Sequence, residues 1–223
     1  MNKLLITAIV SLAMTGVSYA GSFGIGASGS LARVSADGKE VTGAGTNGTA
    51  NTNTKSVDDL AMIGSVFLDY EMDNGITLGF SHVPGTANVS DKTFSRSETA
   101  QGVSGTDASG SVTRTADAEV ENFNTLYVEY PISGGQTFIK AGFSQIDVNT
   151  LENAVTNSGT YGNKTLDGYT LGLGFNGSLG QFFTKTSLEY TDFEDLKLDS
   201  STNNRIEADL DIVEFKVALG KRF

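Results

Sequence analysis

Residues Leu210 to Phe223 read LDIVEFKVALGKRF, a stretch in which apolar side chains recur at every second position. One face of a strand with this sequence is apolar and carries Val213, Phe215, Val217, Leu219 and Phe223. The other face carries Glu214, Lys216 and Arg222. An apolar strand at the edge of a soluble sheet invites pairing with other chains, whereas the last strand of a closed barrel pairs with the first. The stretch therefore favours a closed β-barrel.

The first twenty residues have the pattern of a secretory signal peptide. Lys3 supplies the positive charge, a short apolar run follows, and Val17-Ser-Tyr-Ala20 supplies the small residues of a cleavage site. We predict a signal peptide over residues 1–20, removed after Ala20, and one barrel domain over residues 21–223. No other segment of the sequence is apolar enough for a transmembrane helix, so a membrane-spanning chain has to be a barrel.

Composition narrows the possible functions. The chain has 223 residues, a formal net charge of −11, 27 glycines and no cysteine. The absence of cysteine from the sequence excludes disulfides and thiolate metal sites. The negative charge argues against nucleic acid as a partner, since phosphate binding needs a basic face. A mean hydropathy of −0.10 suits a barrel, in which only alternate residues meet lipid.

Eight segments alternate in period two, as strands with one apolar face do. They span residues 22–34, 58–72, 76–81, 120–130, 139–144, 168–175, 182–190 and 210–223. Long polar linkers alternate with tight turns rich in Asn, Gly or Pro; the long ones cover residues 35–57, 84–118, 147–165 and 192–209. This asymmetry is typical of outer-membrane barrels, which have short periplasmic turns and long extracellular loops. We therefore predict an all-β fold, a transmembrane antiparallel up-and-down barrel of eight strands, or ten if the 84–118 linker holds a further hairpin.

The faces opposite the apolar ones carry charges of both signs. They are Asp69, Glu71, Glu129, Lys140, Lys185, Glu189, Glu214, Lys216 and Arg222. An eight-stranded barrel has an interior that side chains fill, where an unpaired charge is costly. The sequence thus predicts an interior ion network that plugs the lumen, with Glu71 and Arg222 near the rims. If ion pairs seal the lumen, replacing Lys140 and Lys185 with alanine should raise conductance.

Two candidates for chemistry carry little weight in the sequence. The single histidine, His82, follows Ser81, and neighbouring residues of a strand point to opposite faces, so the two cannot form a nucleophile and base unit. The acidic segment from Asp192 to Asp211 lacks the spacing of a calcium loop and reads as a solvated linker. We predict no catalytic residue, no metal site and no cofactor.

The signal peptide, the eight amphipathic segments, the linker asymmetry and the ending Leu219-Gly-Lys-Arg-Phe223 resemble the small bacterial outer-membrane β-barrel family of outer-membrane protein X and the outer-membrane protein A barrel domain. The resemblance implies a location in the bacterial outer membrane, among its lipid and lipopolysaccharide. It also implies that the C-terminal strand is an assembly signal, carried by Phe215, Val217, Leu219 and Phe223. Its readers would be the barrel-assembly machinery and periplasmic chaperones.

The resemblance says little about activity, and three functions stay open. The first is a non-catalytic structural or surface-interaction barrel, with loops that contact lipopolysaccharide, phage or cell-surface ligands. The second is a narrow porin-like channel for small solutes. The third is an enzyme acting on lipids of the outer leaflet.

Overall fold

The computed structural model describes residues 21–42, 51–88, 94–101, 107–152, 161–200 and 205–223. These residues form ten strands and one short 3-10 turn, and none of them belongs to a helix long and apolar enough to cross a membrane. The predicted signal peptide lies outside the described residues. The strands are β1 (Ser22–Thr42), β2 (Asn51–Glu71), β3 (Thr77–Asn88), β4 (Phe94–Gln101), β5 (Asp107–Ile132), β6 (Thr137–Glu152), β7 (Lys164–Leu179), β8 (Phe182–Phe193), β9 (Leu196–Asp199) and β10 (Arg205–Arg222).

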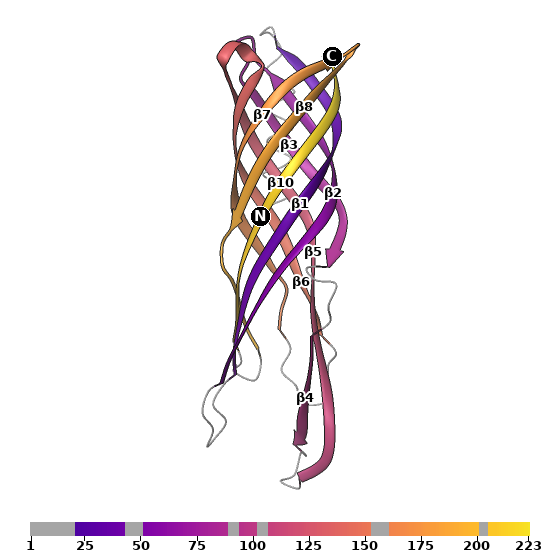
Figure 1. The fold of residues 1–223 in the computed structure, drawn as a ribbon, viewed down its shortest axis with the longest axis vertical. Helices are drawn as coiled ribbons and strands as arrows, with labels where there is room; N and C mark the ends of the chain where they lie inside the picture. The colour runs from indigo at the N-terminus through magenta and orange to yellow at the C-terminus, as the bar shows by residue number, and fades with distance from the viewer. Residues whose placement is uncertain (1–20, 43–50, 89–93, 102–106, 153–160, 201–204) are drawn as a thin grey trace.

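Eight strands close into an antiparallel ring in the order β1-β2-β3-β5-β6-β7-β8-β10, with β10 paired to β1 (Figure 1). The closing seam runs from Gly24 opposite Arg222 to Val41 opposite Arg205. At its turn end, Phe23 and Phe223 exchange two backbone hydrogen bonds, with N···O distances of 3.2 and 2.8 Å. The predicted eight-stranded up-and-down barrel is confirmed.

Two further strands lie off this ring. β4 pairs with the first half of β5 in a hairpin that projects from the loop end, at the bottom of Figure 1. β9 pairs with residues Arg205–Ala208 of β10. The linker 84–118 therefore does hold a hairpin, but its extra strand extends β5 outward and the barrel itself keeps eight strands.

The predicted strand ends were wrong at the loop end of the barrel. β1 continues to Thr42 where the sequence pattern suggested an end at Val34, and β10 begins at Arg205 where the pattern suggested Leu210. Much of the four long linkers is thus strand. At the opposite end the turns are tight, as predicted: the Gly75 amide donates to the Met72 carbonyl at 2.8 Å, and Gly75 has the positive φ of 81° that favours glycine.

The outer face of the ring carries a continuous set of exposed apolar side chains. Every ring strand contributes, for example through Ile25, Leu68, Leu78, Val128, Ile139, Leu171, Leu188 and Val217. A soluble protein seldom exposes so extensive an apolar surface. The same pattern is expected where a barrel meets lipid, and it leaves the opposite faces to fill the lumen.

Candidate functional site

A buried ion triad lies toward the turn end of the lumen. Lys185 on β8 donates from Nζ to Asp69 Oδ2 on β2 at 2.7 Å and to Glu129 Oε2 on β5 at 2.6 Å. All three side chains are buried. Strands β2, β5 and β8 are not neighbours in the ring. Lys185 therefore reaches across the lumen and links separate parts of the barrel wall.

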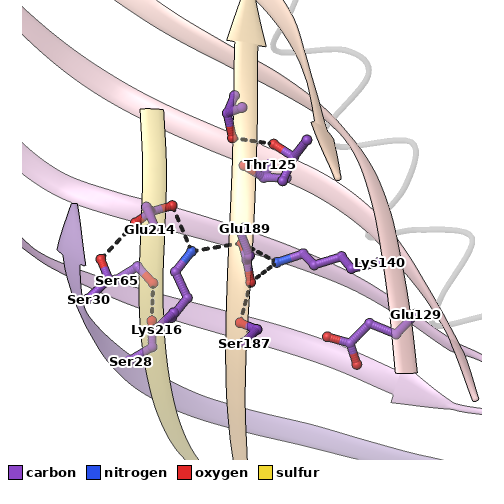
Figure 2. A network of polar contacts seen from close by, with 12 residues as sticks. Ser28, Ser30, Ser65, Thr125, Glu129, Lys140, Ser187, Glu189, Glu214 and Lys216 are labelled. Carbon is purple, nitrogen blue, oxygen red and sulfur yellow. Dashed lines mark hydrogen bonds and ion pairs between the residues drawn. The ribbon is translucent and has the colours of Figure 1, made fainter. Parts of the chain in front are cut away.

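A second, larger cluster lies beside the triad (Figure 2). Glu189 accepts from Lys140 Nζ through both carboxylate oxygens at 2.9 Å and from Lys216 Nζ at 3.1 Å. Lys216 also donates to Glu214 at 3.1 Å, and the Ser30 hydroxyl donates to the same carboxylate at 2.7 Å. Two acids and two bases balance here, so the cluster carries no formal net charge. Hydrogen-bonded pairing of this kind makes charges tolerable in a confined interior.

Little free space remains among these groups. A cavity of about 30 Å³ lies beside the network and is lined by side chains of both clusters and by Ser81 and Tyr127. That volume holds one or two water molecules. The Tyr127 ring lies against Lys140, with Nζ 4.2 Å from the ring centroid. Among the described side chains, the interior at this level is therefore closely packed.

The two remaining charges predicted for the interior lie at the turn-end rim. Arg222 pairs with Glu71 at 2.5 Å, and its guanidinium lies 4.5 Å from the centroid of the Phe183 ring. Both side chains of the pair are partly exposed, which agrees with the expectation that they lie near a rim. The structure thus brings all nine charged residues into pairs, seven in the buried clusters and two at the rim.

On the loop side of the charged clusters, a row of hydroxyl groups crosses four neighbouring strands. Thr125 bonds to Ser144 at 2.9 Å, Ser144 to Thr170 at 2.6 Å, and Thr170 to Thr191 at 2.7 Å. All four side chains are buried. Each hydroxyl can donate one bond and accept another, so the row satisfies its own polar groups without charge.

Beyond the hydroxyl row the lumen becomes apolar. This apolar layer consists of buried hydrophobic side chains from six ring strands and β9: Ala32, Phe123, Ile146, Val148, Leu166, Phe193, Leu196, Leu198, Leu210 and Ile212. Phe123 and Phe193 meet edge to face, with ring centroids 5.8 Å apart. The alternation of apolar and polar residues in the sequence did not predict this layer.

At the level of the apolar layer, apolar and polar residues change faces: the apolar ones point inward and the polar ones outward. On β6 the outward residues change from Phe143 to Asp147, while the inward ones change from Lys140 to Ile146. β10 does the same, because inward Ile212 and Leu210 continue the face of Glu214, with Asp211 and Asp209 on the outside. The exchange therefore marks where the exposed apolar band of the outer face ends, as expected for a strand that passes from lipid to water.

Charged pairs begin on the outer face at this same level. Arg33 on β1 donates from Nε to Asp58 on β2 at 2.7 Å, and both side chains are more than half exposed. This hydrogen bond lowers the pKa of the Asp58 carboxyl from its ordinary value, with a coulombic contribution from the same guanidinium. An exposed pair of this kind contributes little to the stability of a fold, because water screens its charges.

The single histidine lies apart from the buried clusters. His82 Nδ1 is 2.8 Å from Asn124 Oδ1 on the neighbouring strand β5. Ser81 lines the interior cavity, so the two side chains point to opposite faces, as the alternation predicts. Among the described residues, no group of three or more His, Cys, Asp or Glu side chains is arranged to hold a metal ion.

The residues of the predicted assembly signal lie on the outward face of the seam. Phe215, Val217, Leu219 and Phe223 are all exposed, the last by 74%. Their alternate neighbours Glu214 and Lys216 lie in the interior cluster. One strand therefore carries both sets of predicted residues, on its two faces.

Comparison with known proteins supports an assignment by fold. No protein-family model matches the chain, and no curated protein sequence is similar to it. Among solved structures, the outer-membrane protease OmpT from Escherichia coli matches with a TM-score of 0.50 at 9% identity, covering 94% of this chain and 99% of that one. The chain has the outer-membrane β-barrel fold.

Other barrels match less closely. The outer-membrane protein AlkL, studied in lipid bilayers, gives a TM-score of 0.47 at 16% identity and covers 94% of this chain and 93% of its own. Ail of Yersinia pestis, whose structure was determined with a heparin analogue, gives 0.41 at 14% identity and covers 88% and 97%. Identities this low concern the fold alone.

Proposed function

We propose that this chain is a non-catalytic barrel of the bacterial outer membrane with a sealed lumen, serving a structural or surface-interaction role. The exposed apolar band would meet lipid, and the strand extensions and loops beyond it would meet lipopolysaccharide and, outside the cell, phage or cell-surface ligands. Residues 1–20 would direct export and be removed after Ala20.

The observation that carries the proposal is the double closure of the lumen. The charged clusters around Lys185 and Glu189 fill one level, and the apolar layer around Phe123 and Phe193 fills the next. Ions cross an uncharged apolar constriction poorly, and a network of hydrogen-bonded ion pairs leaves them no free path. Both closed levels support a structural role of the barrel in preference to that of a channel.

Conductance in planar bilayers tests this proposal. We expect no steady open state from the wild-type protein, and a small leak from the variant with both Lys140→Ala and Lys185→Ala, because the apolar layer stays in place. Adding Phe123→Ala and Phe193→Ala should increase the leak further, since both layers are then opened. A large, steady open state of the wild-type protein would contradict the sealed lumen and favour the narrow channel.

The enzyme alternative rests on His82 alone. Its partner in the structure is the Asn124 amide, which does not supply the carboxylate or hydroxyl that acyl-transfer chemistry requires. Hydrolysis of lipid A or phospholipid by pure protein, lost on His82→Ala, would overturn the non-catalytic assignment.

We further propose that the outward residues of β10 direct assembly. Deleting Phe223 removes the backbone pair with Phe23 and the exposed terminal aromatic, so the amount of folded barrel in the outer membrane should fall strongly. Leu171→Ala is the matched control, because it removes a lipid-facing side chain away from the seam. Folded protein is measured by its faster migration on unheated gels; equal amounts from both variants would sink the assembly role.

A further inference from the structure

The barrel wall is not closed along its whole height. β2 pairs with β3 only from Val66 opposite His82 to Glu71 opposite Thr77. Towards the loops β2 continues to Asn51, paired with β1 alone, and β3 continues to Asn88, paired with β5 alone. Within the described residues, no strand other than β1 pairs with β2 between Asn51 and Ser65. The two strands thus separate on the loop side of His82.

The sequence supplies a physical reason for the separation. Pro84 has no amide hydrogen and cannot donate to β2, and Gly85 follows it with a φ of 92°. The register between β3 and β5 shifts between Val83 and Thr86, which is a β-bulge. A bulge bends its strand, so β3 is turned away from β2 at this point.

The separation lies where the outer face changes from apolar to charged. Met62 pairs with Leu31 of the apolar band, and Leu60 pairs with Arg33 of the charged level. Met62 is 89% exposed and Leu60 73%, compared with 50% for Val66, where the wall is closed. In the described part of the chain, Met62 and Leu60 have no paired strand on the β3 side, and this accounts for their larger exposed fractions.

Apolar side chains also line the inner side of the separation. Ile63 on β2 and Val83 on β3 point inward, are only partly buried and pack against the apolar layer that contains Phe123. An apolar surface therefore runs from the outward Met62, through the unpaired strand edge, to the inward Ile63. Such continuity is absent from the paired part of the wall, where ladder hydrogen bonds separate the two faces.

We propose that this lateral opening holds an acyl chain of an outer-leaflet lipid, lying between the edge of β2 and the bulge of β3. The inference rests on the proposed membrane location. The apolar band continues directly into the opening, so a lipid chain reaches it without crossing water. Unpaired backbone amides are costly in pure hydrocarbon, but ester and phosphate oxygens of a lipid at this level can accept from them. Further along the edge, Lys55, Asp58 and Asp59 oppose the addition of a strand from another protein.

Tryptophan fluorescence tests the opening, because the natural sequence contains no tryptophan. Three single variants are folded into vesicles whose lipids carry bromine on the acyl chains, which quenches nearby tryptophan. Ile63→Trp reports the opening. Phe193→Trp is the matched control, an inward position of the same apolar layer beside the paired strand β7. Leu171→Trp reports the lipid-facing band. Migration on unheated gels verifies that each variant is folded.

We expect brominated lipid to remove most of the fluorescence of Ile63→Trp and of Leu171→Trp, and to leave Phe193→Trp nearly unchanged. If Ile63→Trp is quenched no more than Phe193→Trp, or is quenched by aqueous acrylamide in preference to brominated lipid, no acyl chain occupies the opening and the inference is overturned. If Leu171→Trp escapes quenching by brominated lipid, the membrane location itself is wrong. The two failures are therefore distinguishable.

Discussion

Replacing Glu189 with alanine should destabilise the barrel by about 3–5 kcal/mol, the range measured when one partner is removed from a buried ion pair. Glu189 accepts hydrogen bonds from Lys140, Lys216 and Ser187. Without it, Lys140 loses both of its short contacts in a buried site. Unfolding in urea, followed by far-ultraviolet circular dichroism in detergent micelles, measures the loss.

Two further variants make this expectation specific. Asp199→Ala removes the exposed partner of Arg205 and should lower the stability far less than Glu189→Ala, because water screens that pair. Adding Lys140→Met to Glu189→Ala should recover part of the lost stability, since the uncompensated ammonium is then gone and Lys216 keeps Glu214. Equal losses for Glu189→Ala and Asp199→Ala would mean that the interior charges are hydrated and not paired.

The alternation of side chains predicts which faces the charges occupy, but not their partners. Lys185, for example, lies 116 residues from Asp69 and 56 from Glu129, and only the ring closure and the tilt of the strands bring them together. The near balance of charges on the inward faces indicated pairing. The contacts themselves depend on the barrel register, which no local pattern of residues encodes.

The apolar layer was missed because the strands were defined by an apolar outer face. In β10, Ile206, Ala208, Leu210 and Ile212 alternate with Glu207, Asp209 and Asp211, so the period of two never stops and only the assignment of faces reverses. Whichever face is apolar, the same alternation continues through Ile206, next to the first residue of β10, Arg205. The opening beside β3 had a signal too, since Pro84-Gly85 interrupts a strand that otherwise continues.

Gly26→Val should prevent proper closure of the barrel, with a cost of about 3 kcal/mol or more, at the upper end for overpacked sites. Gly26 lies on the inward face of the seam, opposite Gly220 on β10 and Phe67 on β2. A Cβ atom built there lies 2.8 Å from the Gly220 Cα and even closer to the Leu219 carbonyl oxygen. Because backbone atoms of the partner strand cannot rotate away, β1 and β10 would have to separate.

Gly29→Val is the matched control on the same strand. Gly29 is exposed on the outward face, and a Cβ atom there meets nothing within 4 Å. A β-branched residue suits an exposed strand position, so this variant should fold as well as the wild-type protein. The folded fraction on unheated gels after refolding into micelles compares the two. Equal folding of both variants would mean that the seam has room for side chains, and that the crowding of Gly26 between Gly220 and Phe67 does not limit closure.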